Sequence, residues 1–186
     1  LGGGRNRGRG VELGRLDQLG VADITYIHLA EALVYLAVIL DAFSRKVIGW
    51  ALATHLRAEL AIEALDMAIA ARRPAPGSLI HHSDRGVQYA CGDYSARLKA
   101  HDIEPSMSRV GNPYDNAKAE RFMRTLKEEE VDGSAYSDVD DAPASIGAFI
   151  EPCYNTHRLH PPPAHLPTQE QHKRITPAWR GLHTPP

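Results

Sequence analysis

The spacing of apolar side chains divides the first half of the chain into three strands and a helix. Residues 21–29, 33–40 and 47–54 are apolar stretches rich in Ile, Val, Leu and Ala, joined by short polar segments. This pattern predicts an antiparallel meander. Between residues 58 and 73 the apolar positions recur at helical spacing, and the proline-containing segment 74–77 ends the predicted helix.

In the second half, short strands alternate with helices. We expect strands at 78–82 and 103–108, a helix at 94–101, a long helix from about 116, and a last helix at 142–155. Three antiparallel strands followed by this alternation indicate an α/β domain, a mixed five-stranded sheet flanked by helices. The order of the elements is that of the ribonuclease-H-like fold.

Composition suggests three segments. Residues 1–20 are rich in Gly and Arg and predict a disordered tail, or alternatively a basic arm that touches phosphates. Residues 21–160 form the predicted core, and residues 161–186 a Pro-rich irregular tail. No apolar run reaches eighteen residues and no signal peptide is visible, which favours a cytoplasmic protein without a membrane segment. The net charge of −2 argues mildly against a protein that grips DNA with its whole surface.

Three acidic residues are candidates for chemistry, each with a plainer alternative. Asp23 lies inside an apolar strand, where a carboxylate costs several kcal/mol unless it is paired or binds a metal. The alternative is a strand-end Asp that pairs with an Arg or caps a loop. Asp84 follows the end of a short strand, and ligands tend to bind at strand ends in α/β sheets. The alternative is an Asx-turn, because Asp followed by Arg-Gly favours a turn. Glu120 lies beside the apolar stripe of its helix, although a solvated glutamate is the default there.

Carboxylates of this kind suit Mg²⁺ or Mn²⁺ far better than zinc. Lys127 lies seven residues after Glu120, about two helical turns or roughly 10 Å away on the same face, where it could hold a DNA phosphate. Zinc binding by His81 and His82 is disfavoured, because adjacent residues on a strand point to opposite faces. Asp41 is a further candidate ligand, but its place before Phe-Ser-Arg-Lys predicts that it closes the turn between two strands.

Several motifs occur together in a familiar order. They are DITYI, LAVILDAFSRKVIGWAL, HHSDRGVQYA, PSMSRVGNPYDNAKAERFMRTLKEEE and YNTHRLH. Over residues 23–160 the chain closely resembles bacterial insertion-sequence transposases of the retroviral-integrase superfamily, in the group whose enzyme comes from the second of two overlapping reading frames. Asp84 and Glu120 are separated by thirty-five residues, the interval typical of that group.

The resemblance implies a function and a site. Asp23, Asp84 and Glu120 would be the DDE metal ligands, and Lys127 the basic residue used near substrate DNA. The implied reaction cleaves the ends of a mobile element to free a 3′-hydroxyl, which then attacks target DNA. Proteins of this group act with Mg²⁺ or Mn²⁺, as multimers on paired DNA ends. The segment before the long helix matches a family signature through Tyr114, Asp115 and Asn116. Three arginines flank the acidic site and are candidate DNA contacts: Arg85, Arg121 and Arg124.

The sequence also departs from the family pattern. Gly20 and Ala22 stand where the family has Trp and Thr, and the segment PPPAHLP at 161–167 replaces the usual continuation after RLH. A region that would read the ends of the element is not found in the sequence. These departures leave two alternatives to an active transposase. One is a truncated, inactive remnant that only binds DNA or a partner, and the other is a nuclease of the same fold that uses water alone.

Overall fold

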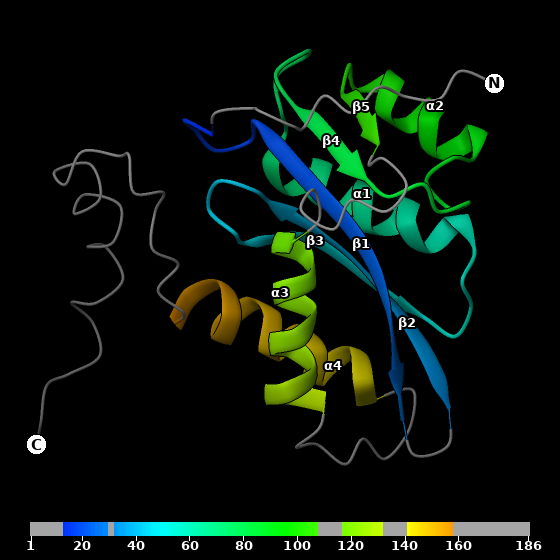
Figure 1. Cartoon of the computed structure of the whole chain (residues 1–186), viewed down its shortest axis with the longest axis vertical. Helices are drawn as coiled ribbons and strands as arrows, with labels where there is room; N and C mark the ends of the chain where they lie inside the picture. The colour runs from blue at the N-terminus through cyan, green and yellow to red at the C-terminus, as the bar shows by residue number, and fades with distance from the viewer. Residues whose placement is uncertain (1–12, 30–31, 108–116, 132–140, 158–186) are drawn as a thin grey trace, which may run out of the picture.

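The computed structural model describes residues 13–29, 32–107, 117–131 and 141–157. Within them, five strands form one mixed sheet in the order β3-β2-β1-β4-β5 (Figure 1). The strands are β1 (Leu19–His28), β2 (Leu33–Asp41), β3 (Val47–Ala53), β4 (Ile80–Ser83) and β5 (Glu104–Met107). β1, β2 and β3 pair in antiparallel fashion, whereas β4 runs parallel to both β1 and β5. The predicted meander and the predicted fold class are confirmed.

Helices cover both faces of the sheet. They are α1 (Ala58–Arg72), α2 (Gly92–Ala100), α3 (Ala117–Leu126) and α4 (Asp141–Ala148), with two π-helical continuations, η2 (Lys127–Val131) and η3 (Phe149–His157). α1 packs on β2, β3 and α2, and α3 crosses β1 and β2 on the opposite face (Figure 1). None of the described helices is long and apolar enough to cross a membrane.

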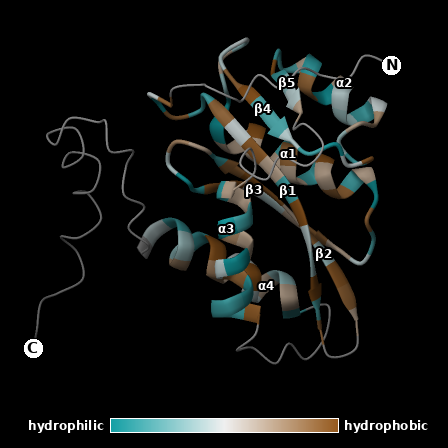
Figure 2. Cartoon of the chain, in the orientation of Figure 1, coloured by the Kyte–Doolittle hydropathy of each residue, from teal (hydrophilic) through white to brown (hydrophobic). Residues whose placement is uncertain are grey.

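Alternation along the strands sorts the apolar residues into two cores, one on each face of the sheet. In β1, Val21 and Ile27 belong to the core under α3 and α4, whereas Ala22 and Ile24 pack with α1 and α2. This is the period of two that a strand imposes on its side chains. Figure 2 shows β1 and β2 as largely apolar strands between the helices. Asp23 is two residues after Val21 on the same strand, so its side chain points to the same face of the sheet, toward α3.

The turn between β2 and β3 is organised by Asp41, as the sequence predicted. The buried carboxylate accepts hydrogen bonds from the backbone N–H of Ser44 at 2.8 Å and from its hydroxyl at 2.5 Å. The backbone N–H of Asp17 donates to the other carboxylate oxygen at 3.0 Å. Because these donors satisfy the carboxylate inside the protein, its burial is compensated without a metal. β1 begins two residues earlier than predicted, at Leu19, close to this turn.

Asn155 closes the outer edge of the sheet. Its side-chain amide accepts from the backbone N–H of Val47 at 3.0 Å and donates to the carbonyl oxygen of Val47 at 2.8 Å. The amide thus makes the two hydrogen bonds that a neighbouring strand would make with this edge residue. It ties η3, at the end of the described chain, to the first residue of β3.

Replacing Asn155 by Ala is expected to lower the free energy of unfolding by about 2 kcal/mol, since two hydrogen bonds to one residue are lost at about 1 kcal/mol each. Urea denaturation would measure the change. Asn155→Asp is the matched variant: it keeps the acceptor, loses the donor, and should fall between Ala and the wild type. An Ala variant as stable as the wild type would show that the bidentate contact contributes nothing.

Candidate active site

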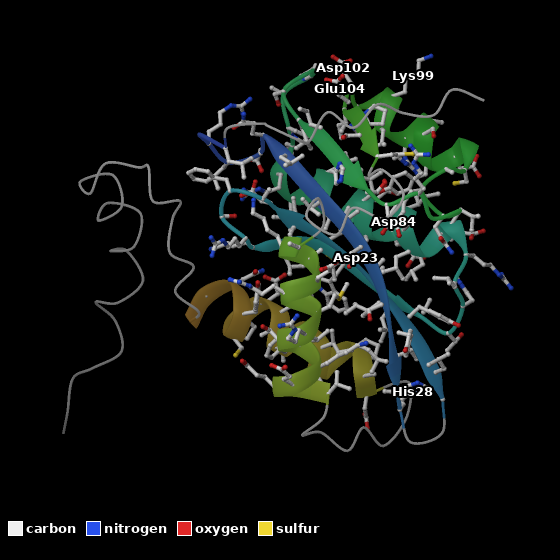
Figure 3. All side chains as sticks on the ribbon, in the orientation of Figure 1. Asp23, His28, Asp84, Lys99, Asp102 and Glu104 are labelled. Atoms are coloured by element: carbon white, nitrogen blue, oxygen red, sulfur yellow. The ribbon has the colours of Figure 1, made fainter. Side chains whose placement is uncertain are left out.

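Asp23 and Asp84 come from neighbouring parallel strands and meet where these strands separate. β1 and β4 pair through Val21 and His82, the last pair of their ladder. The same register continued by two residues brings Asp23 opposite Asp84, although Asp84 already follows the end of β4. Figure 3 shows the two side chains close together near the centre of the molecule. Strands of a sheet lie about 4.8 Å apart, so the fold itself gathers these two carboxylates.

The Asp84 carboxylate is exposed and begins a tight loop. Its Oδ1 accepts a hydrogen bond from the backbone N–H of Gly86 at 2.8 Å, which is the Asx-turn considered from the sequence. A residue larger than glycine does not fit at position 86 unless the Asp84 side chain moves, because a Cβ added at Gly86 would lie 2.9 Å from the same Oδ1. The turn and a metal-binding role are compatible, since a carboxylate has a second oxygen and further lone pairs.

Glu120 lies in the first turn of α3, on the face of the sheet to which Asp23 points. Ala119 beside it is fully buried, together with Phe122 and the rest of the predicted apolar stripe, and this stripe packs on β1 and β2. Glu120 itself is exposed, so packing does not restrict its rotamers.

The first turn of α3 also lies near the turn between β2 and β3. Burial lowers the pKa of Lys118, the positive charge of Arg45 lowers it further, and the carboxylate of Asp41 opposes them. These influences show that Lys118 approaches the β2–β3 turn. The turn built by Asp41 therefore flanks the helix end that carries Glu120.

The structure brings the predicted carboxylates together only in part. Asp23 and Asp84 are neighbours across the sheet, and Glu120 is on the helix above them. Among the described residues, no three His, Cys, Asp or Glu side chains converge closely enough to hold a metal ion.

Lys127 lies at the start of η2, next to the strand that carries Asp23. Its Nζ is 4.7 Å from the centre of the Tyr26 ring, a cation–π contact with an aromatic side chain that is 53% exposed. The prediction that Lys127 shares one face with Glu120 assumed an α-helix throughout. α3 ends at Leu126 and the wider turns of η2 begin at Lys127, so that simple periodicity stops at this residue.

The remaining predicted DNA contacts are placed only in part. Arg85 is exposed in the loop after Asp84, and Arg121 and Arg124 are exposed on α3. Tyr114 and Asn116 lie outside the described residues, as do Asp115, residues 1–12 of the predicted tail 1–20, and the whole predicted tail 161–186.

His81 and His82 point to opposite faces of β4, as predicted. Nε2 of His81 is 2.7 Å from the hydroxyl of Tyr94 on α2, whereas Nδ1 of His82 is 3.0 Å from Oγ of Ser106 on β5. Burial, and then the neighbouring His82, lower the pKa of His81 to about 4, so its ring is neutral at pH 7. Gly20 lies beside His81. A Cβ added at Gly20 would lie 3.6 Å from Nδ1 of His81, which is an ordinary van der Waals distance.

Tyr89 is a residue of the site that sequence reasoning missed. It lies in the motif HHSDRGVQYA, but a tyrosine five residues after an aspartate carries no signal of its own. Burial raises the pKa of its phenol well above the usual range, and Tyr94, Asp23 and Asp84 act in the same direction. Both carboxylates are therefore close enough to the Tyr89 hydroxyl to influence it.

Comparison with known families gives a match over most of the described chain. Two protein-family models, both described as Integrase core domain, match the chain. One covers residues 15–113 and the other residues 101–161. The chain therefore belongs to the integrase core domain family. This confirms the family that the motifs indicated.

Among individual proteins, the chain is similar to the transposase InsF for insertion sequence IS3A of Escherichia coli strain K12. The two are 42% identical over 144 residues, which make up 77% of this chain and 50% of the relative. The chain thus spans about half the length of the curated relatives it matches. The resemblance to insertion-sequence transposases inferred from the motifs is confirmed.

Solved structures share the fold at much lower sequence identity. The HTLV-2 integrase catalytic core domain in complex with magnesium, in its trimeric form, superposes with a TM-score of 0.55 at 14% identity and covers 73% of this chain and 84% of its own. The catalytic domain of Mos1 mariner transposase has a TM-score of 0.59 at 12% identity and covers 72% and 70%. The ribonuclease-H-like arrangement expected from the order of elements is that of these cores.

Proposed function

We propose that this chain is the catalytic core of a DNA transposase, which cleaves the ends of a mobile element and joins them to target DNA. One observation carries the proposal: Asp23 and Asp84 meet where β1 and β4 separate, in a chain of the integrase core domain family. The similarity to an insertion-sequence transposase supports the same reaction. We assign the catalytic core to residues 21–160.

We propose further that Asp23, Asp84 and Glu120 hold Mg²⁺ or Mn²⁺. All three offer the hard oxygen ligands that these ions prefer. Two of them are neighbours, and the third is an exposed side chain on the helix that packs on the strand of Asp23. The HTLV-2 core of the same fold binds magnesium. Ions held by such carboxylates activate an attacking oxygen and stabilise the leaving oxygen of a phosphodiester.

The proposed reaction has two steps on DNA. Water first breaks a phosphodiester at the end of the element and frees a 3′-hydroxyl. This hydroxyl then attacks a phosphorus of the target strand, so one P–O bond forms while the P–O bond to the target's own 3′-oxygen breaks. No bond between protein and DNA is formed. Cations near the carboxylates, namely Lys127, Arg85, Arg121 and Arg124, would bind phosphates, and Tyr114 and Asn116 stay predicted contacts.

The protein would act as an oligomer, because two ends of one element must be joined in a concerted manner. The trimeric form of the HTLV-2 core supports association within this fold.

A strand-transfer assay tests the proposed function. The chain is incubated with labelled duplexes that carry the inverted repeats flanking its gene, and with Mn²⁺ or Mg²⁺. We expect a product shortened at the 3′ end, followed by a longer product joined to target DNA. Chelation of the metal should remove both products, and circular dichroism should show that the protein remains folded.

The two alternatives give different results in the same assay. A remnant that only binds DNA would shift the duplex in a gel without yielding either product in any metal. A nuclease that uses water alone would give the shortened product and never the joined one. Either result, obtained with folded protein, would contradict the transposase proposal.

A further inference from the structure

The hydroxyl group of Tyr89 is a buried polar group without a partner. The side chain is 4% exposed, and its hydroxyl oxygen has no hydrogen-bond partner within the described residues. Such a group destabilises the folded state, because the hydrogen bonds that it makes with water in the unfolded chain are lost. Phenylalanine would fill the same apolar surroundings without this cost. Packing therefore does not account for the hydroxyl.

The ring of Tyr89 is held in one place. It packs edge-on against the ring of Tyr94, with 5.4 Å between the centroids and 79° between the planes. The Tyr94 ring is itself fully buried in this core, and the backbone N–H of Tyr89 donates to the carbonyl of Gly86. Since the phenol oxygen lies on the ring axis, rotation of the ring does not move it. The position of the hydroxyl is thus set by the fold.

This fixed hydroxyl lies near the two carboxylates. Asp23 and Asp84 both act on it electrostatically, and Asp23 has the larger effect of the two. At Gly86, an added Cβ would lie 2.9 Å from Oδ1 of Asp84 and 3.6 Å from the ring carbon Cδ2 of Tyr89, so the Asp84 carboxylate and the Tyr89 ring flank the same residue of the loop. A phenol donates a hydrogen bond, and an ionised carboxylate only accepts.

We infer that Tyr89 is a positioning residue: its hydroxyl, which has no partner within the described residues, donates a hydrogen bond to the Asp23–Asp84 pair when these carboxylates bind metal, and so holds them in the metal-binding arrangement. This inference rests on the proposed function of these carboxylates. Bonds of this kind orient metal-ligating carboxylates, and their loss typically weakens metal binding or activity by about 10- to 100-fold. Tyr89 belongs to the α1–α2 core, on the face of the sheet opposite α3, and it follows the end of β4, where β1 and β4 no longer pair and the carboxylates can be approached from that side.

The test compares Tyr89→Phe with Tyr94→Phe. Both variants remove one buried hydroxyl and keep the ring, but within the described residues only the Tyr94 hydroxyl has a hydrogen-bond partner. Mn²⁺ binding is followed through the electron paramagnetic resonance signal of the free ion, and stability through denaturation in urea without metal. Tyr89→Phe should raise the Kd for Mn²⁺ about tenfold and leave the denaturation midpoint unchanged or higher. Tyr94→Phe should lower the midpoint and leave the Kd as in the wild type.

The same measurements separate the possible failures. If Asp84→Asn weakens Mn²⁺ binding while Tyr89→Phe binds like the wild type, the inference about Tyr89 is wrong and the proposed function stands. If Tyr89→Phe is destabilised like Tyr94→Phe with an unchanged Kd, its hydroxyl is merely structural. If the wild-type protein binds no Mn²⁺, the proposed function fails and the role of Tyr89 fails with it.

Discussion

Asp84→Asn is expected to reduce DNA cleavage and joining by at least about 10³-fold, without unfolding the protein. Charge stabilisation by a bound metal is worth several kcal/mol, and each 1.4 kcal/mol corresponds to a factor of ten in rate. Asparagine has nearly the shape of aspartate and keeps the Oδ1 that accepts from Gly86. The loop should therefore retain its turn, so that the loss reports the missing negative charge and not a changed backbone.

Rates measured in a single turnover with labelled duplexes and saturating Mn²⁺ would check this prediction. Asp102→Asn is a matched control. Asp102 is exposed, lies at the end of the molecule away from Asp23 and Asp84 (Figure 3), and has φ 51°, which asparagine adopts readily. The control should cleave and join like the wild type. An Asp84→Asn variant that retains a tenth or more of the wild-type rate would remove Asp84 from the proposed ligands.

Gly49→Ala is expected to cause the largest loss of stability, about 3 kcal/mol or more. Gly49 lies in the middle of β3, where α1 crosses it. An added Cβ would lie 2.2 Å from the carbonyl oxygen of Ala64, 2.7 Å from the backbone nitrogen of Ala68 and 2.8 Å from its Cβ. Two of these atoms are helix backbone and cannot turn aside as a side chain would. The helix must move off the sheet, and the packing of Leu65 and the core around it is lost.

The free energy of unfolding, measured in urea, would test this. Gly92→Ala is the matched control, because no atom lies within 4 Å of a Cβ built there. Gly92 is the first residue of α2, where alanine should be neutral or stabilise by up to about 1 kcal/mol. If Gly49→Ala were as stable as Gly92→Ala, the close approach of α1 to β3 would be wrong.

Features that depend only on residues close together in the chain could be predicted from the sequence. The turn built by Asp41 follows from an aspartate placed before Ser and Arg at a strand end. The opposite directions of His81 and His82 follow from strand geometry alone. In each case the relevant partner or period lies within a few residues, so no knowledge of the packed chain was needed.

Other features depend on contacts between distant parts of the chain. The two hydrogen bonds of Asn155 to Val47 link positions 108 residues apart. In the sequence, Asn155 belonged to a motif and had no assigned structural role. The change from α3 to η2 at Lys127 was likewise not visible, because the residues on either side have ordinary helical spacing. Such features arise only when elements pack against each other.

The sequence by itself determined the type of each element, the faces of the strands, the family and the identity of the three candidate carboxylates. Only the tertiary structure decided that Asp23 and Asp84 meet, because the parallel register of β1 and β4 depends on packing across an intervening hairpin and helix. It also decided that the hydroxyl of Tyr89, which has no partner within the described residues, lies near them. Local propensity acts over a few residues, whereas the site is assembled by long-range packing that the order of residues does not display.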